Sequence, residues 1–156
     1  IRSATDPTPM RWGNASNPFR AVFVAADGHM VLWEYKGLPY LSAFNPLVKE
    51  VRAGASMFYF AAGDHAELIA GDFAGQIVEL MRTHCGDNRR LGVDKIMLHG
   101  ADALREAGIE ILDGEEVTEK ARAIKGPDEI AAMRCAMHAC EQSMSAMEAA
   151  VAPGMT

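Results

Sequence analysis

The segment "RAVFVAADGHMVLWEY", residues 20–35, decides the fold of this chain. Apolar side chains run through residues 22–24 and return at residues 30–33, and Asp27-Gly28 stands between the two runs. An Asp-Gly pair flanked by apolar runs is a strong signal for a tight turn, because glycine accepts the positive φ that such turns require. The segment therefore predicts an antiparallel β-hairpin.

The segments that follow the hairpin alternate between strand and helix patterns. Short apolar runs predict three further strands, at residues 56–62 ("SMFYFAA"), 90–94 and 109–112. Helical patterns occupy the stretches between and after them, at residues 64–84, 101–107 and 115–124. Because strands joined through a helix pair in parallel, the sequence predicts an α/β fold with a mixed β-sheet flanked by helices.

The first predicted helix has a recognisable start and an apolar face. Asp64 is a candidate N-cap, and Glu67 stands three residues later, at the spacing of a capping box. Gly71 and Gly75, four residues apart, indicate close packing of this helix in the core. The predicted apolar face consists of Leu68, Ile69, Phe73, Ile77, Leu80 and Met81.

The last predicted helix differs from the others because its apolar stripe is long and continuous. Pro127 suits the first helical turn, where its missing N–H is not needed. The stripe consists of Ile130, Met133, Met137, Cys140, Met144, Met147 and Val151. A stripe of this length needs a partner surface of similar length, so we predict that residues 125–156 belong to the next domain and residues 1–124 to a separate one. The alternative is that the helix packs back on its own sheet, as in a self-contained small-molecule-binding domain.

The composition excludes several classes of function. The chain has 156 residues and a formal net charge of −6, which disfavours nucleic acid and anionic membranes as partners. No apolar run approaches the roughly 20 residues of a bilayer-spanning helix. Three cysteines are too few for a disulfide scaffold and fit a reducing compartment, so we expect a cytoplasmic protein.

Few residues carry the pattern of a catalytic or metal site. Cys135 and His138 lie one helical turn apart without further ligands beside them, so we favour packing over metal binding. An acidic cluster could supply paired acid/base carboxylates, but it fits better as the start of a helix, where acids suit the helix dipole. This cluster consists of Asp113, Glu115, Glu116 and Glu119. We therefore predict no catalytic residue and no metal ligand in this chain.

The loop "MRWGNASNPFR", residues 10–20, is the best candidate for a ligand contact. An arginine fork can bind a carboxylate through two hydrogen bonds, and a tryptophan face suits cations and apolar groups. Arg11, Trp12 and Arg20 are therefore the candidate site residues. The alternative is that Trp12 anchors the loop on the core and that the arginines are solvated.

The segment "RAIKGPDEIAAMRCAMHACEQSMSAMEAAVAPGMT", residues 122–156, resembles a domain boundary in the creatinase/prolidase-type enzymes of the pita-bread metallopeptidase superfamily. There an R-x-I-K-x-P-x-E-I segment joins a non-catalytic N-terminal α/β domain to the first helix of the catalytic domain, and a P-G-M-T-like turn ends that helix. The matching residues are Arg122, Ile124, Lys125, Pro127, Glu129, Ile130 and residues 153–156. The resemblance implies that residues 1–124 are such a domain without its own first helix and strand. We expect an excised piece, because the chain begins at Ile1 in what reads as the tail of a strand.

Several shorter segments are similar to the bacterial dimethylsulfoniopropionate lyases, a branch of this superfamily that cleaves rather than hydrolyses. These segments are "NPFRA", "FNPLV", "VDKIMLHG" and "GEEVTEKARAIKGPDEI". In that branch the loop tryptophan is expected at position 13, where this sequence has Gly13 with Trp12 beside it. The resemblance implies a parent enzyme that is either an Xaa-Pro peptidase or creatinase-like metallohydrolase, or a dimethylsulfoniopropionate lyase.

The resemblance also implies cofactors and partners. The parent would hold two divalent metal ions (Mn, Co, Fe or Zn) through Asp, His and Glu residues of its catalytic domain, and none within residues 1–156. Such enzymes are homodimers in which the N-terminal domain of one subunit walls the active site of the other. Arg11, Trp12 and Arg20 are then expected to contact a small-molecule or dipeptide substrate in trans. The alternative is a metal-free pseudo-peptidase that serves as a protein-interaction module.

Overall fold

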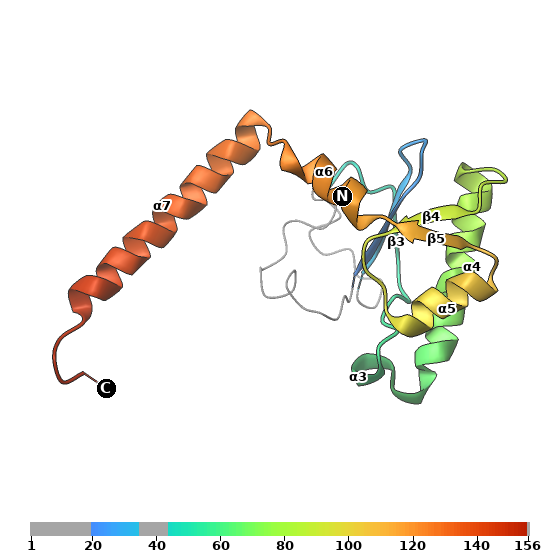
Figure 1. Ribbon diagram of the computed structural model, residues 1–156, viewed down its shortest axis with the longest axis horizontal. Helices are drawn as coiled ribbons and strands as arrows, with labels where there is room; N and C mark the ends of the chain where they lie inside the picture. The colour runs from blue at the N-terminus through green and yellow to red at the C-terminus, as the bar shows by residue number, and fades with distance from the viewer. Residues whose placement is uncertain (1–19, 35–43, 156) are drawn as a thin grey trace. The chain divides into compact units, whose positions relative to one another are not determined.

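The computed structural model describes residues 20–34 and 44–155, and Figure 1 shows the order of their elements. The predicted fold class is confirmed: the chain is α/β, with a small mixed sheet, covering helices and a long C-terminal helix. The chain forms two compact units, Ile1–Thr118 and Glu119–Thr156. The domain boundary expected after residue 124 stays a prediction.

The predicted hairpin is confirmed. Strands β1 (Ala21–Val24) and β2 (Met30–Trp33) pair antiparallel, and the chain reverses through the Asp27-Gly28 turn. Gly28 has a φ of 86°, a conformation that other L-residues rarely adopt. The backbone N–H of Ala25 donates to the carbonyl of His29 at 2.9 Å and closes the turn.

The third strand does not lie where the sequence predicts it. Strand β3 (Glu50–Arg52) pairs in parallel with β2, so the sheet order is β1-β2-β3. The predicted strand at residues 56–62 is wrong: its second half is the single helical turn α3 (Tyr59–Ala62), whose first two side chains are 72% and 88% exposed. Met57 and Phe58 are buried, so the apolar run reflects anchoring of a loop rather than a strand.

The predicted capping box before the first long helix is also wrong. Asp64 lies in a short 3-10 turn, η3 (Gly63–His65). The N-cap of the following helix, α4 (Ala66–His84), is His65, and it makes no side-chain capping bond. The helix itself is confirmed. Most of its predicted apolar face is buried or half-buried, but Leu68 is exposed.

Helix α4 packs against the three-stranded sheet and contributes more residues to the core than any other described element. Gly71 and Gly75 do not take part in this packing: a Cβ at either position would meet nothing within 4 Å, so the predicted close approach is wrong. Both glycines lie on the exposed face of the helix. The buried cluster includes Phe23, Val31 and Trp33 from the hairpin and Phe73, Ile77, Leu80 and Met81 from α4.

A strand–helix–strand unit follows α4. Strands β4 (Arg90–Val93) and β5 (Glu110–Asp113) pair in parallel, and helix α5 (Leu98–Glu106) connects them. The two predicted strands and the helix are confirmed, although the helix starts three residues earlier than expected. The five described strands form two sheets rather than one, and α5 packs beside α4 (Figure 1).

The last two helices follow the sequence closely. Just before helix α6 (Glu115–Ala123), Oδ1 of Asp113, the last residue of β5, accepts the N–H of Glu115 at 2.8 Å. Helix α7 (Pro127–Ala150) begins at Gly126, whose N–H donates to Oε2 of Glu129 at 2.9 Å. Among the described residues, no helix combines the length and the apolarity that crossing a membrane requires.

Candidate functional site

The structure describes one of the three candidate site residues. Arg11 and Trp12 lie outside the described residues. Arg20 directly precedes β1, and its Nε lies 2.6 Å from Oε2 of Glu34, which directly follows β2. Since Ala21 is opposite Trp33 in the hairpin, Arg20 and Glu34 extend the same register by one residue. The pair therefore ties together the two open ends of the hairpin.

The burial of the two partners is unequal. Glu34 is 3% exposed, the one buried charged residue among the described part of the chain, whereas the Arg20 side chain is 24% exposed. A buried carboxylate needs a charged partner, because an unpaired charge in an apolar surrounding is very unfavourable. The backbone of Glu34 is fixed as well, since its N–H donates to the carbonyl of Arg52 at 2.9 Å. Glu34 is thus a rigid acceptor for the arginine, and it is not among the site residues predicted from the sequence.

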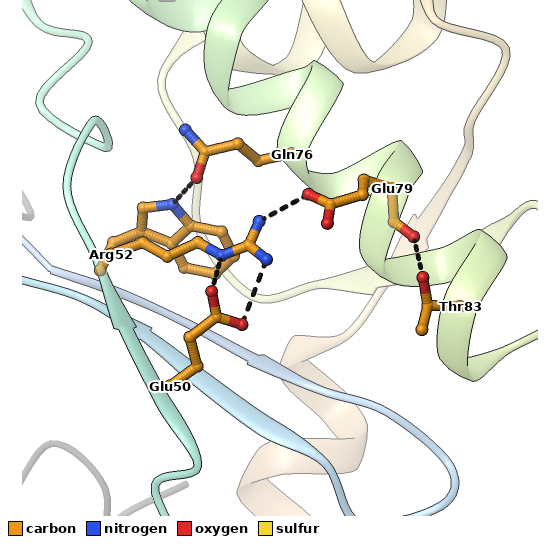
Figure 2. Close-up of polar contacts among 6 residues, drawn as sticks. Glu50, Arg52, Gln76, Glu79 and Thr83 are labelled. Atoms are coloured by element: carbon orange, nitrogen blue, oxygen red, sulfur yellow. Dashed lines mark hydrogen bonds and ion pairs between the residues drawn. The ribbon is translucent and has the colours of Figure 1, made fainter.

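A second arginine cluster lies between β3 and α4 (Figure 2). Arg52 donates from Nε and Nη2 to the two carboxylate oxygens of Glu50, at 2.6 and 3.1 Å, and from Nη1 to Glu79 at 3.0 Å. These bonds raise the pKa of Arg52, first through the hydrogen bond to Glu50. Nearby, the indole N–H of Trp33 donates to Oε1 of Gln76 at 2.8 Å. The cluster fastens α4 to the sheet, which is a structural role.

Two histidines meet at the tip of the hairpin. The rings of His29 and His84 stack with centroids 3.9 Å apart and planes 13° apart, and Nδ1 of His84 lies 2.9 Å from Oδ2 of Asp27. The pKa of Asp27 is lowered from 3.8, first because its carboxylate accepts the backbone N–H of His29 and then through the bond to His84. The arrangement joins the turn to the last residue of α4.

The described residues do not fit a metal centre. Within residues 20–34 and 44–155, no three His, Cys, Asp or Glu side chains come close enough to hold a metal ion. The two-metal site that the resemblance implies belongs to the catalytic domain and stays a prediction.

The acidic cluster serves the start of α6, as expected. Asp113 lies two residues before the helix and accepts the N–H of its first residue, Glu115, and Glu115 and Glu116 lie in the first turn. Glu119 pairs with Arg122 one turn later, at 2.7 Å. These carboxylates lie just before the helix and along its surface, so their contacts are those of a stabilised helix start.

The second unit carries an open apolar groove of about 630 Å³ beside the first half of α7. Lys125 and Arg134 are among the polar residues at its edge. Its apolar lining includes Ile124, Ile130, Met133 and Met137. The rest of the stripe, through Met144, Met147 and Val151, is exposed as well. A continuous exposed apolar surface of this kind usually marks a contact with another protein surface.

The chain is similar over nearly its whole length to two curated proteins that share one name. No protein-family model matches the chain. The dimethylsulfoniopropionate lyase DddP of Roseovarius nubinhibens is 60% identical over 148 residues, which cover 95% of this chain and 33% of that protein. The lyase of the same name from Roseobacter denitrificans is 59% identical over 148 residues, with the same coverage. The chain therefore spans about a third of the length of these curated relatives.

Proposed function

We propose that this chain is the non-catalytic N-terminal domain, with the first helix of the next domain, of a dimeric pita-bread metalloenzyme that cleaves dimethylsulfoniopropionate. The observation that carries the proposal is the identity of 60% and 59% to two dimethylsulfoniopropionate lyases across 95% of the chain. Identity at this level over nearly every residue favours the lyase over the hydrolase branch and over a metal-free interaction module.

The proposal assigns the metal chemistry to residues beyond this chain. As the family resemblance implies, the two divalent ions would be held by Asp, His and Glu residues of the catalytic domain. Such ions act as Lewis acids that stabilise developing negative charge. The role of this chain is then to shape the substrate pocket of the partner subunit and to support the dimer.

The substrate's chemistry matches the candidate site residues. Dimethylsulfoniopropionate carries a cationic sulfonium at one end and a carboxylate at the other. Arg11 and Arg20 suit the carboxylate through the guanidinium fork, and Trp12 suits the sulfonium through its ring face. We propose that these three residues contact the substrate in trans.

The apolar stripe of α7 supports the proposed domain organisation. Ile130, Met133 and Met137 are exposed along with the rest of the stripe, and burying such side chains is strongly favourable. We propose that the catalytic domain covers them in the whole protein. The three free cysteines suit a reducing compartment, and we propose that the enzyme is cytoplasmic.

The proposal is tested by assaying the whole protein with its metals. Breaking the bond between the sulfonium sulfur and the propionate chain releases dimethyl sulfide, a volatile product that gas chromatography measures directly. We expect its release from dimethylsulfoniopropionate and little hydrolysis of Xaa-Pro dipeptides. Dipeptide hydrolysis without dimethyl sulfide would favour the hydrolase branch. A whole protein that contains no stoichiometric metal and has neither activity would favour the interaction module.

A further inference from the structure

The buried carboxylate of Glu34 has no role in the proposed function, although its partner Arg20 does. We propose that Glu34 is a positioning residue, which holds the guanidinium of Arg20 in the orientation that binds the substrate carboxylate. The inference rests on the proposed function, because it requires a carboxylate-bearing substrate. The inference goes beyond the proposed function because it assigns a role in substrate binding to Glu34, a buried residue.

The geometry of the contact favours an orienting role. Oε2 of Glu34 lies 2.6 Å from Nε of Arg20, the nitrogen at which the planar guanidinium joins its flexible stem. An arginine carries five N–H donors in a fixed fork. A bond at Nε to a rigid acceptor therefore fixes the plane of the whole group, including the terminal nitrogens that bind carboxylates in pairs.

The burial of Glu34 points in the same direction. The residues of β2 are all buried and apolar, and Glu34 continues this strand with a charged side chain that is 3% exposed. A buried ion pair is often no more stabilising than well-packed apolar residues, so stability does not explain the choice. The pair between Arg52 and Glu50 differs, because the Glu50 side chain is 40% exposed and remains partly solvated. A charged acceptor at position 34 is explained if its task is to hold the guanidinium of Arg20 in one orientation.

The alternative is that the pair only fastens the ends of β1 and β2. The two roles predict different kinetics. A fastener affects the folded fraction, and hence the stability and the apparent kcat, but the folded enzyme keeps its KM. A positioning residue affects ground-state binding of the carboxylate, so the KM rises in enzyme that remains folded.

The test uses the full-length, metal-loaded protein and dimethylsulfoniopropionate as substrate. We expect Arg20→Ala to raise KM about tenfold or more, the loss typical of one charge-assisted hydrogen bond. Glu34→Gln should raise KM several-fold, and it should add little when Arg20→Ala is already present. Glu50→Gln, which perturbs the neighbouring arginine pair, is the matched control and should leave KM unchanged.

Each other outcome overturns a specific statement. An unchanged KM in folded Glu34→Gln, with only a lower melting temperature, overturns the positioning role. If Glu34→Gln does not fold, Arg20→Lys is the variant to measure, since lysine keeps the positive charge beside Glu34 but lacks the planar guanidinium. A wild-type KM in Arg20→Lys overturns the inference. An active wild type with unchanged KM in Arg20→Ala overturns the inference but leaves the lyase proposal standing. A wild type that releases no dimethyl sulfide overturns both.

Discussion

The indole N–H of Trp33 donates to the side-chain oxygen of Gln76 at 2.8 Å, and this bond joins the middle strand of the sheet to α4 (Figure 2). Trp33 is fully buried, and Phe73 packs edge-on against it with ring centroids 5.1 Å apart. A buried indole requires an acceptor, because its single donor cannot otherwise replace its bond to water. The placement of α4 on the sheet thus depends on a specific polar contact inside an apolar core.

Removal of this acceptor should destabilise the first unit. Gln76→Ala leaves the indole N–H without its partner, and we expect a loss of about 1–3 kcal/mol in the free energy of unfolding. Chemical denaturation followed by tryptophan fluorescence measures the change. Gln142→Ala, at an exposed position of α7, is the matched control. Equal stability of the two variants would show that the bond contributes nothing.

A methyl group at position 114 should be more harmful than one at position 71. A Cβ on Gly114 would stand 2.8 Å from the backbone carbon of Gly92 and the nitrogen of Val93, and backbone atoms cannot move aside as a flexible side chain can. We expect Gly114→Ala to cost about 1–3 kcal/mol of stability. Gly71→Ala meets nothing within 4 Å and should stabilise α4 by about 0.5–1 kcal/mol. Thermal unfolding compares the two, and the same sign for both would contradict this account.

The carboxylate of Asp27, in the hairpin turn, should make the stability of the fold depend on pH. The folded pKa of Asp27 is lowered, so its contribution to stability is fully present above the unfolded pKa, near pH 4, and is lost as the pH falls through the folded pKa. Asp27→Asn should therefore lower the melting temperature slightly at pH 5, and the difference from wild type should shrink towards pH 3. Asp94→Asn, at an exposed position, is the control. A difference that grows on acidification would show that the sign is wrong.

The exposed apolar stripe of α7 should contribute to stability only in the whole protein. We expect Met137→Ala to destabilise the whole protein by about 2 kcal/mol or more, the usual effect of truncating a buried methionine. In residues 1–156 alone, where Met137 is exposed, the same change should stay within about 0.5 kcal/mol. Differential scanning calorimetry of both forms makes the comparison. A neutral Met137→Ala in the whole protein would mean that no domain covers the stripe.

Local signals predicted most of the fold. The Asp27-Gly28 turn located the hairpin, the helical pattern of residues 115–124 located α6, and Pro127 with the apolar stripe of residues 130–151 located α7. The two errors in strand placement have different physical origins. Strand β3 contains a single apolar residue, Val51, and forms because β2 offers an open edge, which is a non-local cause. The run at residues 56–62 misled the prediction, because a short apolar run does not distinguish a strand from a buried loop.

The site was predicted less completely. Arg20 was identified as an arginine in a suitable loop, but Glu34 was not, although the hairpin register places it opposite Arg20. Extending the register by one residue beyond each strand could have found the pair. The stack of His29 on His84 offers no such signal, because it depends on the length and direction of α4.

We propose that this chain supports a lyase without performing its chemistry. The most direct test measures dimethyl sulfide released from dimethylsulfoniopropionate by the whole protein and, at equal molar concentration and with the same divalent metals, by residues 1–156 alone. We expect turnover by the whole protein and none above background by residues 1–156. Release of dimethyl sulfide by residues 1–156 alone would contradict it.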